Sequence, residues 1–188
     1  MSTFHFVILL GSNLNKDHNM RQAQARLAAH RDLSIQAYSA VLDTPAVDSQ
    51  GRPTGQPSYL NMAVRGTTKL DYVELRAQLR QIEAELGRVR NQPTSTPKSI
   101  EVPIDLDIAL FGADLYTNEP CRDEHISTRE HADADSLHIH PDVASAMHAA
   151  VPIAQILPDW IHPQQQKSIQ QIARTLMDTP SLQVATRT

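Results

Sequence analysis

Hydrophobic and polar positions along the chain switch between the repeat of a strand and that of a helix. Continuous or alternating apolar runs predict four strands, at residues 4–10, 33–42, 58–67 and 103–111. Apolar positions spaced by three and four predict four helices, at residues 16–30, 72–86, 141–150 and 164–177. The order βαββαβ with a helical C-terminal extension indicates an α+β sandwich, in which helices cover one face of an antiparallel sheet. The other face would be open and a natural place for a site.

The second helix has the clearest pattern. Asp71 is placed to cap it, with Glu74 three residues later, and Gly87 follows its last apolar residue. Among the connections, residues 44–57 contain three prolines and two glycines and predict a long, ordered loop of the kind that often carries function. Residues 112–114 predict a turn into a short partner strand at residues 115–116.

Two acidic residues carry the most informative chemistry. Asp105 and Asp107 lie two residues apart in a predicted strand, so both carboxylates should project from the same face. Ile104, Leu106 and Ile108, with Leu110, are expected on the opposite face. Adjacent carboxylates repel each other unless a cation lies between them, and Mg²⁺ commonly combines one or two carboxylates with substrate phosphates. The alternative is a solvated strand face whose acids only keep the sheet soluble.

A second pair belongs to the preceding strand. Tyr59 and Asn61 share one face, and the loop that begins at Thr44 leads into them. An aromatic ring beside an amide can hold a flat heterocycle, because the ring stacks and the amide reads polar edges. An ordinary half-buried tyrosine with a hydrogen-bonding neighbour would give the same pattern.

Composition limits the classes of function. The chain has 188 residues with 40% hydrophobic residues, which suits a single domain over residues 1–188. A net charge of −4 gives no support for a nucleic-acid partner. The single cysteine, Cys121, allows no internal disulfide, and the N-terminus shows neither a signal peptide nor a membrane segment. We therefore expect a cytoplasmic protein without a membrane partner.

Five segments resemble, in the same order, those of the 6-hydroxymethyl-7,8-dihydropterin pyrophosphokinase family. They are GSNL at 11–14, TP at 44–45 with QPSYLN at 56–61, IE at 82–83 with GRVR at 87–90, PIDLDIALF at 103–111, and HPD at 140–142 with PIAQILPDW at 152–160. This resemblance covers roughly residues 4–160. It implies a ferredoxin-like α+β fold and, in folate biosynthesis, transfer of pyrophosphate from ATP to the hydroxymethyl group of the reduced pterin, with release of AMP.

The resemblance also implies site residues. The catalytic residues would be Asp105, Asp107 and Arg88, and the two aspartates would hold two Mg²⁺ ions with ATP. Pterin would be bound by Thr44, Pro45, Val47, Tyr59, Asn61 and His148. ATP would be bound by Glu83, Arg90, Lys98, Ile108 and His140.

Several positions depart from the family pattern. Val102 takes the place of a phosphate-binding arginine, which Lys98 would replace without the bidentate geometry of a guanidinium. His148 takes the place of a second pterin-stacking aromatic residue, and Ala146 and Asp135 take the places of basic residues.

Three alternatives to an active pyrophosphokinase follow from the sequence. The departures from the pattern motivate a diverged relative that binds pterin or nucleotide with weak or no kinase activity. The βαββαβ order is shared with RNA-binding modules, which would need stacked aromatics and a basic face. His138, His140 and His148 could in principle hold zinc, but no fourth ligand stands out, and exposed or capping histidines explain them better.

Overall fold

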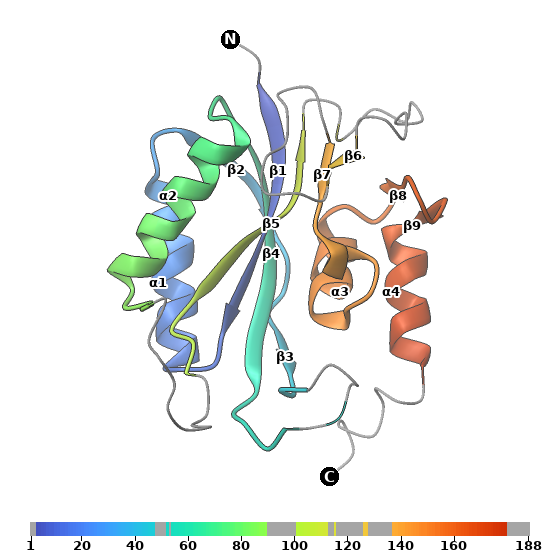
Figure 1. Cartoon of the computed structure of the whole chain (residues 1–188), viewed down its shortest axis with the longest axis horizontal. Coiled ribbons are helices and arrows are strands. Elements are labelled where there is room, and N and C mark those ends of the chain that lie inside the picture. The colour runs from blue at the N-terminus through green and yellow to red at the C-terminus, as the bar shows by residue number, and fades with distance from the viewer. Residues whose placement is uncertain are drawn as a thin grey trace.

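The computed structural model describes residues 3–47, 52, 54–89, 101–112, 115, 126–127 and 137–179, and its main sheet lies between two layers of helices (Figure 1). The strands of this sheet are β1 (Phe4–Ser12), β2 (Leu33–Tyr38), β3 (Leu42–Thr44), β4 (Tyr59–Thr68), β5 (Asp105–Gly112), β6 (Ile126–Ser127) and β7 (Leu137–Ile139). β8 (Ile161–His162) and β9 (Lys167–Ser168) form a separate pair. The helices are α1 (Lys16–Ala29), α2 (Tyr72–Glu85), the 3₁₀ helix η2 (Pro141–Val143), α3 (Met147–Ile156) and α4 (Ile169–Asp178). Within the described residues, no helix is long and apolar enough to cross a membrane.

The sheet has the strand order β2-β4-β1-β5-β7-β6, and β3 also pairs with β4. Neighbouring strands are antiparallel except β6 and β7, which are parallel. Along the chain, β1, α1, β2, β4, α2 and β5 follow the βαββαβ order, and β1 and β4 lie at the centre. This arrangement is consistent with a ferredoxin-like sandwich and confirms the predicted α+β class.

Helices α1 and α2 cover the first face of the sheet. Their buried side chains, among them Met20, Leu27, Leu75 and Leu79, pack against the first face in one core. At the start of α2, Asp71 forms the predicted capping box with Glu74. At its end, Gly87 has a φ of 90°, a conformation that glycine adopts without strain.

Helices α3 and α4 cover the second face, so the expectation of helices on one face only is wrong (Figure 1). The second face presents Val7, Leu9 and Ala63, which are apolar and buried against these helices. Apolar residues on both faces of a sheet must be covered on both. At one end of this face, however, the apolar residues give way to Asn61 and the two aspartates of β5.

A β-bulge in β5 explains one error in the predicted facing of residues. Val7 pairs with Leu110 whereas Ile8 pairs with Ile108, so Ala109 is the extra residue. The side chains of Ile104, Leu106 and Ile108 face the first core as predicted, but Leu110 lies in the second. The bulge frees the carbonyl of Ala109, which accepts a hydrogen bond from the His140 amide at 2.8 Å.

Four predicted segments differ from the structure. The strand predicted over 33–42 is divided into β2 and β3, because the hydroxyl of Ser39 accepts from the Ala63 amide and the chain leaves the ladder. Leu115 lies in a turn, and β7 is the partner of β5 instead; Tyr116 falls outside the described residues.

The two C-terminal helices also begin later than predicted. The helix expected over 141–150 is interrupted, because extended backbone at Ala146 separates η2 from α3. The helix expected from residue 164 begins at Ile169, where Ser168 and Gln171 form a capping box. The preceding residues instead form a tight turn between β8 and β9, with Gln166 at a φ of 51°.

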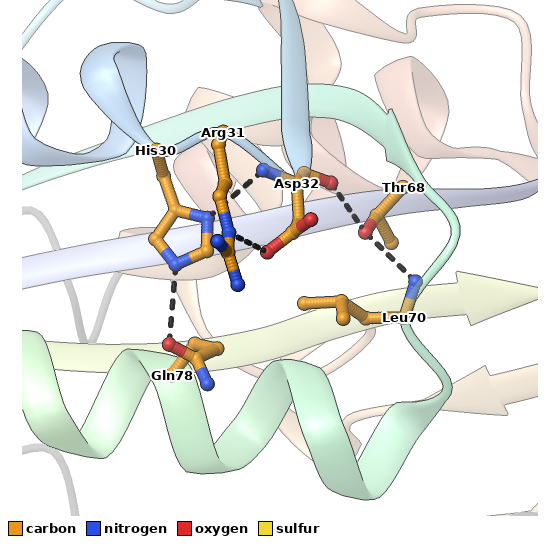
Figure 2. Close-up of polar contacts among 6 residues, drawn as sticks. All are labelled: His30, Arg31, Asp32, Thr68, Leu70 and Gln78. Carbon is orange, nitrogen blue, oxygen red and sulfur yellow. Dashed lines mark hydrogen bonds and ion pairs between the residues drawn. The ribbon is translucent and has the colours of Figure 1, made fainter.

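A network of hydrogen bonds lies at the end of the sheet at which β2 begins and β4 ends (Figure 2). His30 follows α1 and contacts Gln78 of α2 through Nε2, while its Nδ1 accepts from the Asp32 amide. The carbonyl of Asp32 accepts from the Thr68 hydroxyl at 2.7 Å, and that hydroxyl accepts from the Leu70 amide. Figure 2 shows that these contacts join both helices of the first layer to the sheet.

Candidate active site

Three predicted site residues come together at the other end of the sheet, where β4 and β5 begin. Gly11 near the end of β1 pairs with Asn61 on one side and with Asp105 on the other. Asp107 lies two residues further along β5, opposite Leu9. Because residues in register on neighbouring strands share a face, the amide and both carboxylates project from the second face.

Gly11 keeps the space between these groups open. A Cβ at this position would lie 3.3 Å from Oδ1 of Asn61. The row Asn61–Gly11–Asp105 therefore has two polar side chains separated by a residue without one.

Arg88 brings a positive charge to this row. Its guanidinium lies 3.4 Å from Oδ1 of Asp105 and also donates to the carbonyl of Ile104. Asp105 is half-buried, whereas Asp107 is exposed. Arg88 thus offsets part of the repulsion between the two carboxylates and leaves Asp107 facing solvent.

Tyr59 and Thr44 lie next to Asn61. The side-chain amide of Asn61 donates to the Thr44 hydroxyl at 2.7 Å, and Thr44 pairs with Tyr59 between β3 and β4. Burial raises the pKa of the Tyr59 phenol; Arg88 and a hydrogen bond from Asn13 oppose this shift, and Asp105 reinforces it.

Pro45 is half-buried and Val47 is exposed in the segment that follows β3. Both are near Thr44 in sequence, and their predicted contact with pterin remains a prediction.

The last residue of β1 and the residue that follows it have a structural role that the sequence did not reveal. The hydroxyl of Ser12 donates to the Pro103 carbonyl at 2.6 Å, and Oδ1 of Asn13 accepts from the Val102 amide at 2.6 Å. These bonds fix the chain immediately before β5. Val102 is only 5% exposed, so the position that holds a phosphate-binding arginine in the family pattern here points into the protein.

Asp142 joins two of the predicted histidines. His148 lies 3.4 Å and His140 lies 3.9 Å from Oδ2 of Asp142, and Nδ1 of His140 accepts from the Asp142 amide. The hydrogen bond with His148 lowers the pKa of Asp142; burial raises it, and the charge of both imidazoles lowers it further. The bond from the His140 amide to Ala109 places this group beside β5. Sequence reasoning assigned no role to Asp142.

Two predicted ATP ligands, Glu83 and Ile108, are buried on the side of the first core. Ile108 packs in that core, and the carboxylate of Glu83 accepts from the Leu106 amide at 2.9 Å. Their side chains are therefore not brought to the face that carries Asp105 and Asp107. Arg90 and Lys98 lie outside the described residues.

The polar groups of the second face suit a hard cation bound together with phosphate. Carboxylate oxygens on one face are the protein ligands that Mg²⁺ takes when substrate phosphates and water complete its shell. Within the described residues, no cluster of three or more histidine, cysteine or acidic side chains could hold a metal. The ring of His138 lies against Tyr72, with the hydroxyl 3.4 Å from Nε2, so it belongs to the opposite side of β7 from Ile139.

Comparisons with known proteins agree with the motifs. A family model described as 7,8-dihydro-6-hydroxymethylpterin-pyrophosphokinase matches residues 7–158. A 2-amino-4-hydroxy-6-hydroxymethyldihydropteridine pyrophosphokinase of Bacillus subtilis (strain 168) is 31% identical over 151 residues, which cover 79% of this chain and 75% of the relative. The protein of that name in Haemophilus influenzae is 36% identical over 115 residues, 60% of this chain and 65% of the relative.

A plant relative is much longer. The folate synthesis bifunctional protein of Arabidopsis thaliana is 39% identical over 107 residues, which cover 56% of this chain and 20% of the plant protein. The chain thus spans about a fifth of the length of this relative.

Proposed function

Since the chain belongs to the 7,8-dihydro-6-hydroxymethylpterin-pyrophosphokinase family, as its motifs predicted, we propose that it transfers pyrophosphate from ATP to 6-hydroxymethyl-7,8-dihydropterin. The observation that carries this proposal is the row Asn61–Gly11–Asp105 with Asp107 beside it. This row places a group that can read a heterocycle next to a pair that can hold a cation with phosphates.

In this reaction the hydroxymethyl oxygen of the pterin attacks the β-phosphorus of ATP. The bond between that phosphorus and the oxygen bridging to the α-phosphorus breaks, AMP leaves, and the hydroxyl proton is released. Phosphoryl transfer of this kind depends mainly on positioning and on neutralising charge. Mg²⁺, when bound by Asp105 and Asp107, supplies that neutralisation at the phosphates.

The remaining residues position the substrates. Tyr59 stacks on the pterin, while Asn61 and the segment that begins at Thr44 hold its polar edge. The hydrogen bond from the Asn61 side chain to the Thr44 hydroxyl fixes the Asn61 amide. Arg88 stands beside Asp105 and can bind a phosphate oxygen while remaining next to that carboxylate. His140 and His148, held by Asp142, contact the nucleotide and the pterin respectively.

Release of AMP from Mg-ATP, with and without the pterin, tests this function. We expect pterin-dependent AMP from the wild type and a loss of about a hundredfold or more in Asp107→Asn, because the variant removes a carboxylate ligand of the Mg²⁺ that neutralises the transferred group. Asp159→Asn is the matched control, since Asp159 is exposed and follows α3.

Two outcomes would contradict the proposal. If the folded wild type binds ATP but releases no AMP with pterin, the chain is a diverged nucleotide-binding relative, and the buried Val102 becomes the leading explanation. If Asp107→Asn retains full activity, the assignment of the metal pair is wrong.

A further inference from the structure

We propose that Glu83 is a positioning residue that holds the backbone between Asp105 and Asp107 and thereby sets the direction of both carboxylates. This inference rests on the proposed function, because it concerns the Mg²⁺ pair of that site. It differs from the role that the family resemblance gave Glu83, which was direct contact with ATP.

The first step is the place of Glu83 in the fold. It lies in the last turn of α2, and its side chain is 1% exposed. Its Oε1 accepts a hydrogen bond of 2.9 Å from the amide of Leu106, the residue between the two aspartates. A carboxylate is rarely buried so completely unless its oxygens are bound, so this contact defines where the side chain points.

The second step is the environment of β5 at this point. β1 borders β5 on one side, with Gly11 opposite Asp105. On the other side, β7 pairs with β5 at Leu110 and Phe111, further along the strand. Around Leu106, among the described residues, the contact on this side comes from Glu83 in the last turn of α2.

Residues at and just after the end of α2 contact three consecutive residues, 104–106, at the start of β5. The guanidinium of Arg88 bonds to the Ile104 carbonyl and lies beside Asp105, while Glu83 holds Leu106. The backbone amide of Arg88 in turn donates to the backbone carbonyl of Glu83 at 2.9 Å, so the backbone positions from which the two side chains extend are held together.

The third step separates positioning from direct contact. α2 covers the first face of the sheet, and Leu106 faces the first core, whereas Asp105 and Asp107 project from the second face. Glu83 therefore acts on the metal pair through the backbone of β5. Groups that orient metal ligands in this way influence metal affinity without touching the metal.

Two conservative variants distinguish these roles. Glu83→Gln keeps the length and the accepting oxygen but removes the charge, whereas Glu83→Asp keeps the charge but withdraws the oxygen from Leu106. The measurement is the gain in affinity for a non-hydrolysable ATP analogue on adding Mg²⁺, by titration calorimetry without pterin. Glu85→Gln and Glu85→Asp are the matched controls, because Glu85 is exposed on the same helix.

We expect Glu83→Gln to keep the Mg²⁺-dependent gain within about twofold and Glu83→Asp to lose about tenfold of it. Both variants should keep their affinity for the analogue without Mg²⁺. A role in stability alone would shift the unfolding temperature of Glu83→Asp and leave the Mg²⁺-dependent gain unchanged, which would overturn the proposal. Loss of the gain in Glu83→Gln would also overturn it, because the charge itself would then contact metal or nucleotide.

This measurement also separates the inference from the proposed function. A wild type that gains affinity with Mg²⁺ but releases no AMP with pterin would contradict the proposed reaction and leave the role of Glu83 standing. A wild type without any Mg²⁺-dependent gain would contradict the metal pair, and the positioning role with it.

Discussion

At the scale of single residues, Gly11 separates Asn61, the proposed pterin ligand, from Asp105, a proposed metal ligand. Its two register partners, Asn61 and Asp105, carry the polar groups, and among the described residues Oδ1 of Asn61 is the only neighbour within 4 Å of a Cβ placed at Gly11. A methyl group there would push on the Asn61 amide, which we propose to read the pterin, and would leave Asp105 untouched.

We therefore predict that Gly11→Ala weakens pterin binding more than ATP binding. The pterin Kd should rise about fivefold, which corresponds to about 1 kcal/mol. The free energy of unfolding should change by less than about 1 kcal/mol, because a small shift of one amide relieves the contact. Titration of each ligand separately checks this, and equal losses for pterin and Mg-ATP would contradict it.

A second residue, Asp142, contributes to the free energy of unfolding in a way that depends on pH. Its pKa in the folded protein is lowered, chiefly by the hydrogen bond with His148. The ionised form is therefore more favourable in the folded chain than in the unfolded one. This contribution to stability is complete above the unfolded pKa and is lost as the pH falls through the folded pKa.

Asp142→Asn should accordingly destabilise the protein at pH 6 but not near pH 3. The difference at pH 6 should stay below about 1 kcal/mol, because the side chain is 43% exposed and its ion pairs are screened. Urea unfolding at both pH values measures the difference, with Asp159→Asn as an exposed control. A difference that grows toward pH 3 would show that the sign is wrong.

At the scale of elements, local patterns predicted the parts of the fold that depend on local interactions. The capping box of α2 and the alternation of side chains between the two faces of β4 both follow from neighbours in the sequence. Both are confirmed, since Asp71 and Glu74 form the box, Met62 and Val64 lie in the first core and Ala63 lies in the second. The interruption at Ala146 and the late start of α4 were missed because the flanking residues are compatible with a helix. Apolar spacing does not reveal a turn fixed by backbone geometry at Gln166.

The same limit applies to the site. The shared face of Asp105 and Asp107 follows from a period of two, since the bulge at Ala109 comes after them. The bond from Glu83 to Leu106 joins residues 23 positions apart, and the bond from Ser12 to Pro103 joins residues 91 positions apart. Contacts between residues so far apart in sequence produce no periodic pattern. The sequence therefore predicted the chemical groups of the candidate site but not the hydrogen bonds that hold their backbone in place.

At the scale of the whole molecule, the two cores share one sheet. Along β1, Phe6, Ile8 and Leu10 point into the first core, and Val7 and Leu9 point into the second. Separating either helical layer from the sheet would expose one face of the same strands. The two layers should therefore unfold together, as single small domains usually do.

Leu75→Ala tests this coupling because Leu75 is fully buried in the first core, while the single tryptophan, Trp160, packs against the second. The substitution should cost about 3 kcal/mol through lost burial and a cavity. Urea unfolding followed by Trp160 fluorescence and by far-ultraviolet circular dichroism should give the same lowered midpoint. Val73→Ala, at an exposed position of the same helix, should shift neither signal appreciably. A circular dichroism midpoint that moves while the tryptophan midpoint stays in place would mean that the layers unfold independently, and the site at the end of their common sheet could then lose its support from one side only.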